Sequence, residues 1–375
     1  MRILVLASQF GGRGGIQYAG RLVLRALREW AGADAEITVL SVHDGGADLA
    51  GLDASCTVVT ARGSHLKTLW RAWQLLRGER WDLVLLGHLH LAPLLALASP
   101  ALSTAVVAMI YGIEAWQQVS GLRRRGLLKA DGLLYISQHT RDNCEALNVW
   151  MKEIPGAVCY LGLLPDEGRS SVAAPPPGCD PGRFAVAIGR MDCGERYKGF
   201  DELIRIWPRV ERVHPEFKLV LIGDGSDRQR LQSLAGDVKA SVVFTGGIDD
   251  ELRDCFLRNC AALCLPSRGE GFGLVYLEAM RLSKPVLAGS TDAGREVVAD
   301  GQTGRTVSGQ DPEELLAGIL DVLGERGKAL GLAGRERFLE HFSYPRFYER
   351  FTGQLERTAG RTARTRATVN AAAIG

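Results

Sequence analysis

Long apolar segments are absent from this chain of 375 residues. No run of about 18 apolar residues is free of charges and helix breakers, so no transmembrane helix is expected. The apolar run after Met1 and Arg2 is too short for the core of a signal peptide. The eight cysteines form no C-x-x-C pair and no Cys/His cluster with zinc spacing, which indicates reduced thiols. These absences predict a cytoplasmic protein.

Acidic tripeptides of the form D-x-D, which clamp a divalent cation, are also absent, and no metal is expected. The net charge is only +2, so nothing points to a nucleic-acid partner. Residues 1–165 carry +3, residues 166–355 carry −4 and the last twenty carry +3. This distribution indicates an anionic partner for the first half, although ordinary scatter explains the counts equally well.

The composition is that of a globular protein, with 46% apolar and 23% charged residues, and the length predicts two domains. Short apolar runs alternate with amphipathic segments, which is typical of parallel sheets covered by helices. The first half has expected strands at 3–7, 37–42, 83–86, 105–110 and 132–136, with helices at 18–30 and 65–76. The second half has expected strands at 184–188, 218–222, 242–244, 262–265 and 285–288, with helices at 199–214 and 311–323.

These two series predict an α/β protein of two Rossmann-like, doubly wound domains that face each other across a cleft. Ligands are expected at the C-terminal ends of the strands. We place the first domain at 1–164, a Pro/Gly/Ser-rich linker at 165–182 and the second domain at 183–342. A C-terminal helix at 343–360 is expected to return to the first domain, followed by a flexible tail at 361–375.

Glycines cluster between the first expected strand and the first expected helix, where they let backbone N–H groups approach a phosphate. A dinucleotide fingerprint G-x-G-x-x-G beginning at Gly12 would need a third glycine where the chain has Gln17. Asp44 stands where a ribose-binding acid could be, but the failed spacing disfavours a dehydrogenase. A glycine-mediated contact with an anion remains the expectation.

The segment 266–280 reads P-S-R-G-E-G-F-G-L-V-Y-L-E-A-M and follows an expected strand. Its glycines, Gly271 and Gly273, open a helix whose N–H groups suit a diphosphate. Glu270 lies before the helix, where a carboxylate can accept hydrogen bonds from sugar hydroxyls. Glu278 lies on the second turn, where a carboxylate can hold a ribose diol. The alternative is that both are ordinary surface glutamates.

Arg190 and Lys198 lie in the loop after the first strand of the second domain. Two cations beside a helix N-terminus can neutralise a diphosphate and stabilise it as a leaving group. Taken alone, this loop fits a solvated basic segment better.

As a set, the motifs G-R-x(7)-K-G-F, L-V-L-I-G-D-G, F-T-G, the glutamate segment and D-G-x-T-G resemble the retaining glycosyltransferase group 1 family (family 4). The resemblance covers 184–308 closely, and the first domain loosely through Gly15 and residues 111–114. It implies the GT-B fold and transfer of a sugar from a nucleotide-diphosphate sugar. It also implies roles for individual residues: Glu270 on the donor sugar, Glu278 on the ribose, Arg190 and Lys198 on the diphosphate, and Gly15, Ile248, Asp250, Arg253, Gly271, Phe272, Gly273 and Leu274 in donor binding.

One position departs from the family pattern. Many relatives have His-Gly where this chain has Tyr111-Gly112, and the family histidine contacts the donor sugar. Tyr111 is expected either to donate a hydrogen bond in its place or to be a core residue. His88 and His90, at the end of an expected strand, are candidates that fit a structural role better.

The sequence thus predicts a retaining, metal-independent glycosyltransferase without a resident cofactor. The spacing of The expected acceptor is a lipid-linked glycan in envelope or exopolysaccharide synthesis. The alternatives are a small-molecule acceptor, a nucleotide-sugar epimerase, a phosphorylase, or a nucleotide-sugar binding protein without activity.

Three basic or aromatic features of the first half predict peripheral attachment to the inner face of the cell membrane. Each can also be read as a solvated helix face or as core packing. They are a stripe of Arg21, Arg25 and Arg28, a cluster of Lys67, Trp70, Arg71 and Trp73, and the run Arg123, Arg124 and Arg125.

Overall fold

The computed structural model describes residues 1–12, 14–45, 55–78, 80–96, 104–165, 178–236 and 241–374, with side chains as far as residue 360. The chain forms two compact units. Unit 1 is Met1–Leu161 with Pro345–Gly375, and unit 2 is Gly162–Tyr344. Most of the linker expected at 165–182 lies outside the described residues.

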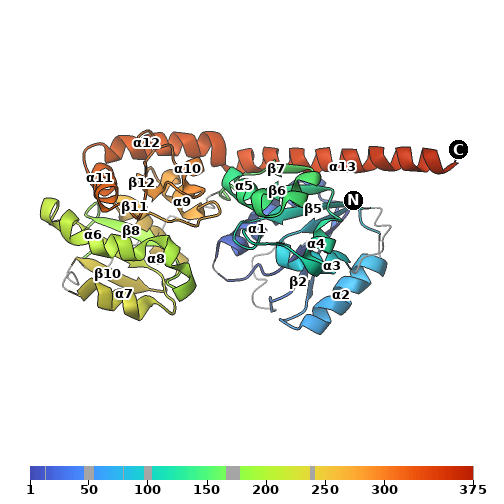
Figure 1. Ribbon diagram of the computed structural model, residues 1–375, viewed down its shortest axis with the longest axis horizontal. Helices are drawn as coiled ribbons and strands as arrows, with labels where there is room; N and C mark the ends of the chain where they lie inside the picture. Colours follow the sequence, from blue (N-terminus) through green and yellow to red (C-terminus); the bar gives the residue numbers. More distant parts are fainter. Residues whose placement is uncertain are drawn as a thin grey trace. The chain divides into compact units, whose positions relative to one another are not determined.

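In the described part of unit 1, seven parallel strands form one sheet in the order β3-β2-β1-β4-β5-β6-β7 (Figure 1). The central strands are apolar and buried on both faces, as parallel sheets covered by helices require. The strands are β1 (Arg2–Ala7), β2 (Glu36–Ser41), β3 (Thr57–Thr60), β4 (Leu83–Leu86), β5 (Ala105–Ile110), β6 (Gly132–Tyr135) and β7 (Gly156–Val158).

Amphipathic helices cover this sheet. Helix α1 (Gly15–Ala31) buries Ala19, Leu22, Val23, Ala26 and Leu27, which recur at the spacing of one helix face. The others are α2 (His65–Gly78), α3 (Ala92–Ala96), α4 (Gly121–Leu127), α5 (Gln138–Leu147) and α13 (Tyr344–Ile374).

Helix α13 belongs to unit 1 from Pro345 onward, although it follows unit 2 in the chain. Arg350 donates to the carbonyl of Tyr160 at 3.2 Å, and the indole of Trp30 donates to Glu356 at 3.3 Å. The helix continues to Ile374 (red in Figure 1), so the tail expected from residue 361 is helical. The reason is the alanine and arginine content of this stretch, because both residue types have high helix propensity.

In the described part of unit 2, six parallel strands follow the order β10-β9-β8-β11-β12-β13. They are β8 (Phe184–Ile188), β9 (Lys218–Ile222), β10 (Val242–Gly246), β11 (Ala262–Leu265), β12 (Val286–Gly289) and β13 (Arg305–Val307). The helices are α6 (Phe200–Val213), α7 (Arg228–Ala235), α8 (Asp250–Asn259), α9 (Leu274–Arg281), α10 (Gly294–Val297), α11 (Pro312–Leu323) and α12 (Gly327–Arg337).

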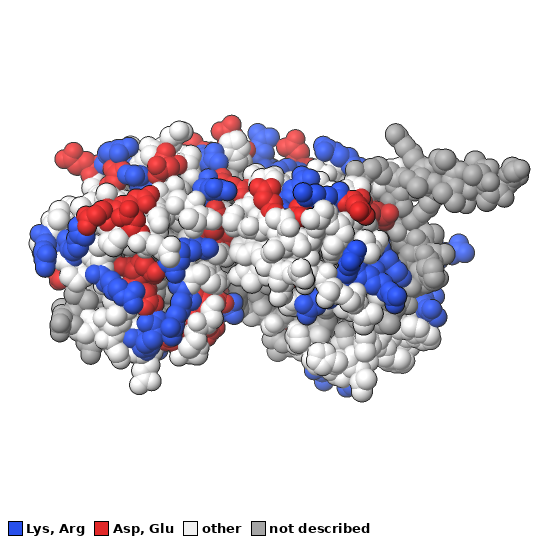
Figure 2. Space-filling model, in the orientation of Figure 1, with Lys and Arg blue, Asp and Glu red and all other residues white. Residues whose placement is uncertain are grey.

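Acidic and basic side chains are interspersed on the face of unit 2 seen in Figure 2. Several join neighbouring elements, as Arg209 on α6 does with Glu313 on α11 through two contacts of 2.7 Å. Exposed pairs of this kind contribute little stability, about 0–1 kcal/mol each. The core of the unit therefore depends on its buried apolar strands, and the strand order decides where a ligand site can form.

Candidate functional site

The carboxyl ends of β8 and β11 form the switch point of the unit 2 sheet. The two strands are paired neighbours, with Ala185 opposite Ala262. The chain leaves β8 toward β9 on one side and leaves β11 toward β12 on the other. In open α/β sheets, ligands bind where the strand order reverses in this way. The loops at this point are 189–199 after β8 and 266–273 after β11.

Lys198 and Glu270 join these two loops. The Lys198 ammonium lies 2.9 Å from Glu270 Oε1 and 3.7 Å from Glu195 Oε2, and each of the three side chains is less than one-fifth exposed. Burial alone would lower the pKa of Lys198, but the facing carboxylates raise it to about 12. Arg190, which is 72% exposed, forms an ion pair with the same Glu195. The structure thus brings together Arg190, Lys198 and Glu270, and adds Glu195, which the sequence motifs did not single out.

The backbone of Glu270 is fixed by a buried acid from a third loop. Asp292, after β12, accepts hydrogen bonds from the N–H groups of Glu270 at 2.7 Å and Gly294 at 2.8 Å. Burial raises the pKa of Asp292 to about 6, against the effect of these two donors. The sequence analysis missed Asp292, whose only signal is its place after an apolar strand next to β11.

The N-terminus of α9 follows directly. Gly273 has φ of 91°, and a Cβ there would lie 2.3 Å from the Tyr276 ring, so only glycine fits. No side chain caps this end, and Leu274 is the first helical residue. The first N–H groups of a helix have no intrahelical partner and favour an anion. Phe272 is different: its ring is buried and packs edge-on against Phe342, so only its backbone can face a ligand.

Glu278 on α9 pairs with Arg253 on α8. Their side chains approach to 2.5 Å, with 15% and 27% of their surfaces exposed, and Glu278 raises the pKa of Arg253. Asp250 is the first residue of α8, and Ile248 is half-buried in the loop before it. The expected ribose ligand and the expected base-side arginine are therefore direct partners.

Gly15 and Tyr111 belong to unit 1. Gly15 is exposed at the start of α1. Tyr111 follows β5 and is buried, which raises its pKa, and its N–H donates to Glu114 at 2.7 Å. Its ring lies nearly parallel to that of His88, with centroids 6.0 Å apart.

His88, after β4, is a neutral imidazole. Burial, together with Arg123, lowers the pKa of His88 to about 4. The N–H of His90 donates to His88 Nδ1 at 3.2 Å, which leaves the ring proton on Nε2. The buried position of Tyr111 and His88 fits the core reading and leaves one N–H donor on the His88 ring.

Asp44 is fully buried and takes up part of the glycine loop after β1. Its carboxylate accepts from the N–H groups of Phe10 at 2.7 Å and Gly11 at 2.9 Å, and from the Ser41 hydroxyl at 2.7 Å. A ribose hydroxyl would have to compete with these donors. This arrangement agrees with the prediction that the chain is not a dehydrogenase.

The sequence was then compared with known proteins. The sequence profile described as "Glycosyl transferases group 1" matches residues 182–325. The GDP-mannose-dependent alpha-(1-6)-phosphatidylinositol monomannoside mannosyltransferase of Mycolicibacterium smegmatis is 30% identical over 302 residues, which cover 75% of this chain and 74% of the relative. The chain belongs to the group 1 glycosyl transferases. A mannosyltransferase of Corynebacterium glutamicum, specific by name for the monoacylated acceptor, is 29% identical over 71% of this chain and 74% of its own length.

Solved structures confirm the fold class of this glycosyltransferase. Sucrose-phosphate synthase from Thermosynechococcus elongatus aligns with a TM-score of 0.74 at 20% identity, over 95% of this chain and 98% of that one. Anabaena HepE in complex with UDP and glucose aligns with a TM-score of 0.72 at 18% identity, over 95% and 99%. The expected GT-B class of two Rossmann-like units is thus confirmed, as is the expectation of a transferase.

The glycosyltransferase carries an exposed apolar face on α2. Leu66, Leu69, Trp70 and Trp73 recur along one side of the helix and are 80%, 43%, 51% and 47% exposed. A cavity of about 340 Å³ opens beside it, lined by Thr60, Ala61, Arg62, Lys67, Trp70 and Arg71. The aromatic and basic cluster expected at this helix is therefore on the surface.

The basic stripe expected on α1 is wrong as a free surface. Arg21 donates to the carbonyl of Phe10 at 2.6 Å, and Arg28 donates to that of Ala35 at 2.8 Å. Both arginines are close enough to chain turns to bind main-chain oxygens, which the spacing alone could not show. Among the described helices, none is both long enough and apolar enough to cross a membrane.

Proposed function

We propose that this glycosyltransferase moves mannose from GDP-mannose to an acceptor with retention of configuration and without a metal ion. The observation that carries the donor class is the Lys198–Glu270 pair beside the uncapped N-terminus of α9. A cation and helix N–H groups suit a diphosphate, and the adjacent carboxylate suits sugar hydroxyls. The printed donor dependence of the Mycolicibacterium smegmatis relative supports GDP-mannose over UDP-sugars.

In this proposal the bond between the sugar and the leaving diphosphate breaks while Lys198, Arg190 and the start of α9 stabilise the developing charge. Glu270 exchanges its contact with Lys198 for sugar hydroxyls as the diphosphate arrives. Glu278 orients the ribose, with Arg253 holding its carboxylate. The acceptor hydroxyl attacks from the face that the diphosphate leaves, and a phosphate oxygen takes its proton. No protein base is then required.

A panel of nucleotide sugars tests the donor and the absence of a metal. GDP-mannose at 100 times its Kd should add about 2.7 kcal/mol to the free energy of unfolding, because a ligand of the native state stabilises it. Thermal unfolding with GDP-mannose, UDP-glucose and UDP-galactose measures the preference. Transfer of labelled mannose should persist in EDTA. A larger shift with a UDP-sugar would change the donor, and a loss of transfer restored by Mg²⁺ or Mn²⁺ would overturn the metal-free chemistry.

We further propose that the acceptor is a lipid at the cytoplasmic face of the membrane. The exposed leucines and tryptophans of α2 suit the interface of a bilayer, and Arg62, Lys67 and Arg71 line a cavity with no acidic residue. In the described part of the chain, no ion pair to these three cations is seen. The names of the mycobacterial relatives, which act on phosphatidylinositol lipids, support an anionic lipid.

Vesicle flotation tests this surface. Wild-type protein should float with anionic vesicles and less with neutral ones, because each basic residue near anionic lipid contributes about 1 kcal/mol. The variant Trp70→Ser/Trp73→Ser should stay at the bottom of the gradient. The control Leu332→Ser/Leu339→Ser removes two apolar side chains of similar exposure, 52% and 48%, and should float normally. If the wild type ignores anionic vesicles and glycosylates a water-soluble acceptor efficiently, the lipid acceptor is wrong.

A further inference from the structure

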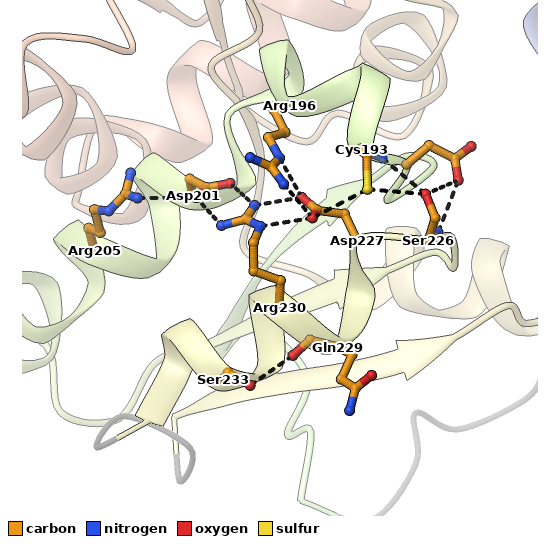
Figure 3. Close-up of polar contacts among 10 residues, drawn as sticks. Cys193, Arg196, Asp201, Arg205, Ser226, Asp227, Gln229, Arg230 and Ser233 are labelled. Atoms are coloured by element: carbon orange, nitrogen blue, oxygen red, sulfur yellow. Dashed lines mark hydrogen bonds and ion pairs between the residues drawn. The ribbon is translucent and has the colours of Figure 1, made fainter.

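A chain of ion pairs lies directly behind the loop that carries Arg190 and Lys198 (Figure 3). Asp227, after β9, has only 4% of its side chain exposed and accepts two guanidinium groups at once. Arg196 reaches it through two contacts of 2.9 Å, and Arg230 through contacts of 2.8 and 2.6 Å. These hydrogen bonds hold the pKa of Asp227 well below its usual range. The carboxylate is therefore charged under ordinary conditions and fully used.

The chain continues from Arg230 to the other end of the same loop. Arg230 donates to both oxygens of Asp201 at 2.7 Å, and Asp201 lies in the first turn of α6, three residues after Lys198. Arg196 lies two residues before Lys198, in the short 3₁₀ segment Cys193–Lys198. Asp227 thus grips the segment just before Lys198 and, through Arg230, the helix just after it.

The beginning of the loop is held by the same region. Met191 N–H donates to the carbonyl of Asp224 at 2.9 Å, and Asp227 N–H donates to the carbonyl of Met191 at 2.7 Å. Gly225 permits this approach, since a Cβ there would lie 2.5 Å from the Met191 carbonyl. Asp192 accepts from Ser226 N–H at 3.0 Å. The loop from Arg190 to Lys198 is therefore anchored at its start, before Lys198 and after it.

We propose that Asp227 is a positioning residue for the diphosphate of the donor: it acts through Arg196 and Arg230 and holds Lys198 and Arg190 in the geometry that meets the two phosphates. This inference rests on the proposed function, because it assigns the loop's cations to a diphosphate. Preorganisation of this kind matters because fixed charges stabilise a leaving group without having to reorganise during the reaction. A purely structural network would support the fold of unit 2 but would leave recognition of the phosphates unchanged.

The test compares Asp227→Asn with Asp321→Asn. Asp321 on α11 also joins two arginines, Arg305 at 2.7 Å and Arg326 at 3.0 Å, and 14% of its side chain is exposed. Both variants should lower the thermal unfolding temperature, because each leaves two arginines without a partner. Only Asp227→Asn should weaken GDP binding, by about 10- to 100-fold, since displacing a positioned group by about 1 Å has effects of this size. Binding of guanosine, measured by displacement, should stay unchanged in both.

A second variant keeps the test independent of folding. Arg196→Gln changes a side chain that is 53% exposed, and it should reproduce the loss of GDP affinity with guanosine binding intact. A loss in Arg196→Gln without one in Asp227→Asn would make Arg196 a direct ligand and overturn the inference. Equal loss of GDP and guanosine binding in Asp227→Asn would also overturn it. If the wild type binds neither GDP nor UDP, the proposed function fails instead.

Discussion

The Lys198→Ala variant is expected to transfer sugar about 10²- to 10³-fold more slowly than the wild type, which is the usual effect of removing one preorganised charge stabiliser. Lys198 is the partly buried cation that joins the loops after β8 and β11, and its contact with Glu270 is 2.9 Å long. Removing it leaves the developing charge of the diphosphate with only Arg190 and the α9 N–H groups. Initial rates with labelled donor at saturating concentration measure the effect in kcat.

Lys218→Ala is the matched control for this experiment. Lys218 lies on β9 in the same unit, and its ammonium donates to the carbonyl of Gly178 at 2.7 Å. Its loss should leave kcat within about twofold of the wild type, because this residue is remote from the switch point. Arg190→Ala should also slow transfer by orders of magnitude. An unchanged kcat in Lys198→Ala would remove the diphosphate assignment for the loop.

The Glu278→Ala variant is expected to bind GDP about 10- to 150-fold more weakly, because a charge-assisted hydrogen bond contributes about 1.5–3 kcal/mol. Glu278 is 15% exposed and holds Arg253 at 2.5 Å, so the variant also leaves that arginine without its partner. Titration calorimetry with GDP gives the affinity, and thermal unfolding gives the effect on the free protein. Glu270→Ala should show the opposite pattern, with slower transfer and little change in GDP affinity.

Glu145→Ala controls for the loss of an ion pair as such. Glu145 pairs with Arg141 on α5 at 2.9 Å, and 13% of its side chain is exposed, almost the same as for Glu278. It should lower the unfolding temperature to a similar degree and leave GDP affinity unchanged. If Glu278→Ala also leaves GDP affinity unchanged, the ribose assignment is incorrect.

The central strands could be predicted from sequence because each is an apolar run too long and too uniform to be a loop. Strands β4 and β5 are fully buried and carry no polar residue. By contrast, β3, β7 and β13 were not predicted. Each is three or four residues long and lies at an edge of its sheet, where half-buried residues give no clear pattern. Their existence depends on a neighbouring strand that the local sequence does not contain.

The candidate site shows the same division. Arg190, Lys198, Glu270 and Glu278 could be selected because each lies in a short motif that follows an apolar strand. Their partners could not, because Asp292 and Asp227 come from other loops that the strand order brings to the same edge. The α1 arginines failed for the converse reason: helical spacing places them on one face but cannot show that Phe10 and Ala35 offer carbonyl oxygens there.

Asp44 and Asp227 occupy matching places, each on the loop after the second strand of its unit. In unit 1 the carboxylate binds the backbone N–H groups of Phe10 and Gly11, in the loop where Rossmann folds receive a nucleotide phosphate. In unit 2 it binds the side chains of Arg196 and Arg230 instead. Two sheets of like topology therefore need not mean two nucleotides per polypeptide. The expected stoichiometry is one, and an engineer who wanted a second cofactor in this scaffold would begin by replacing Asp44.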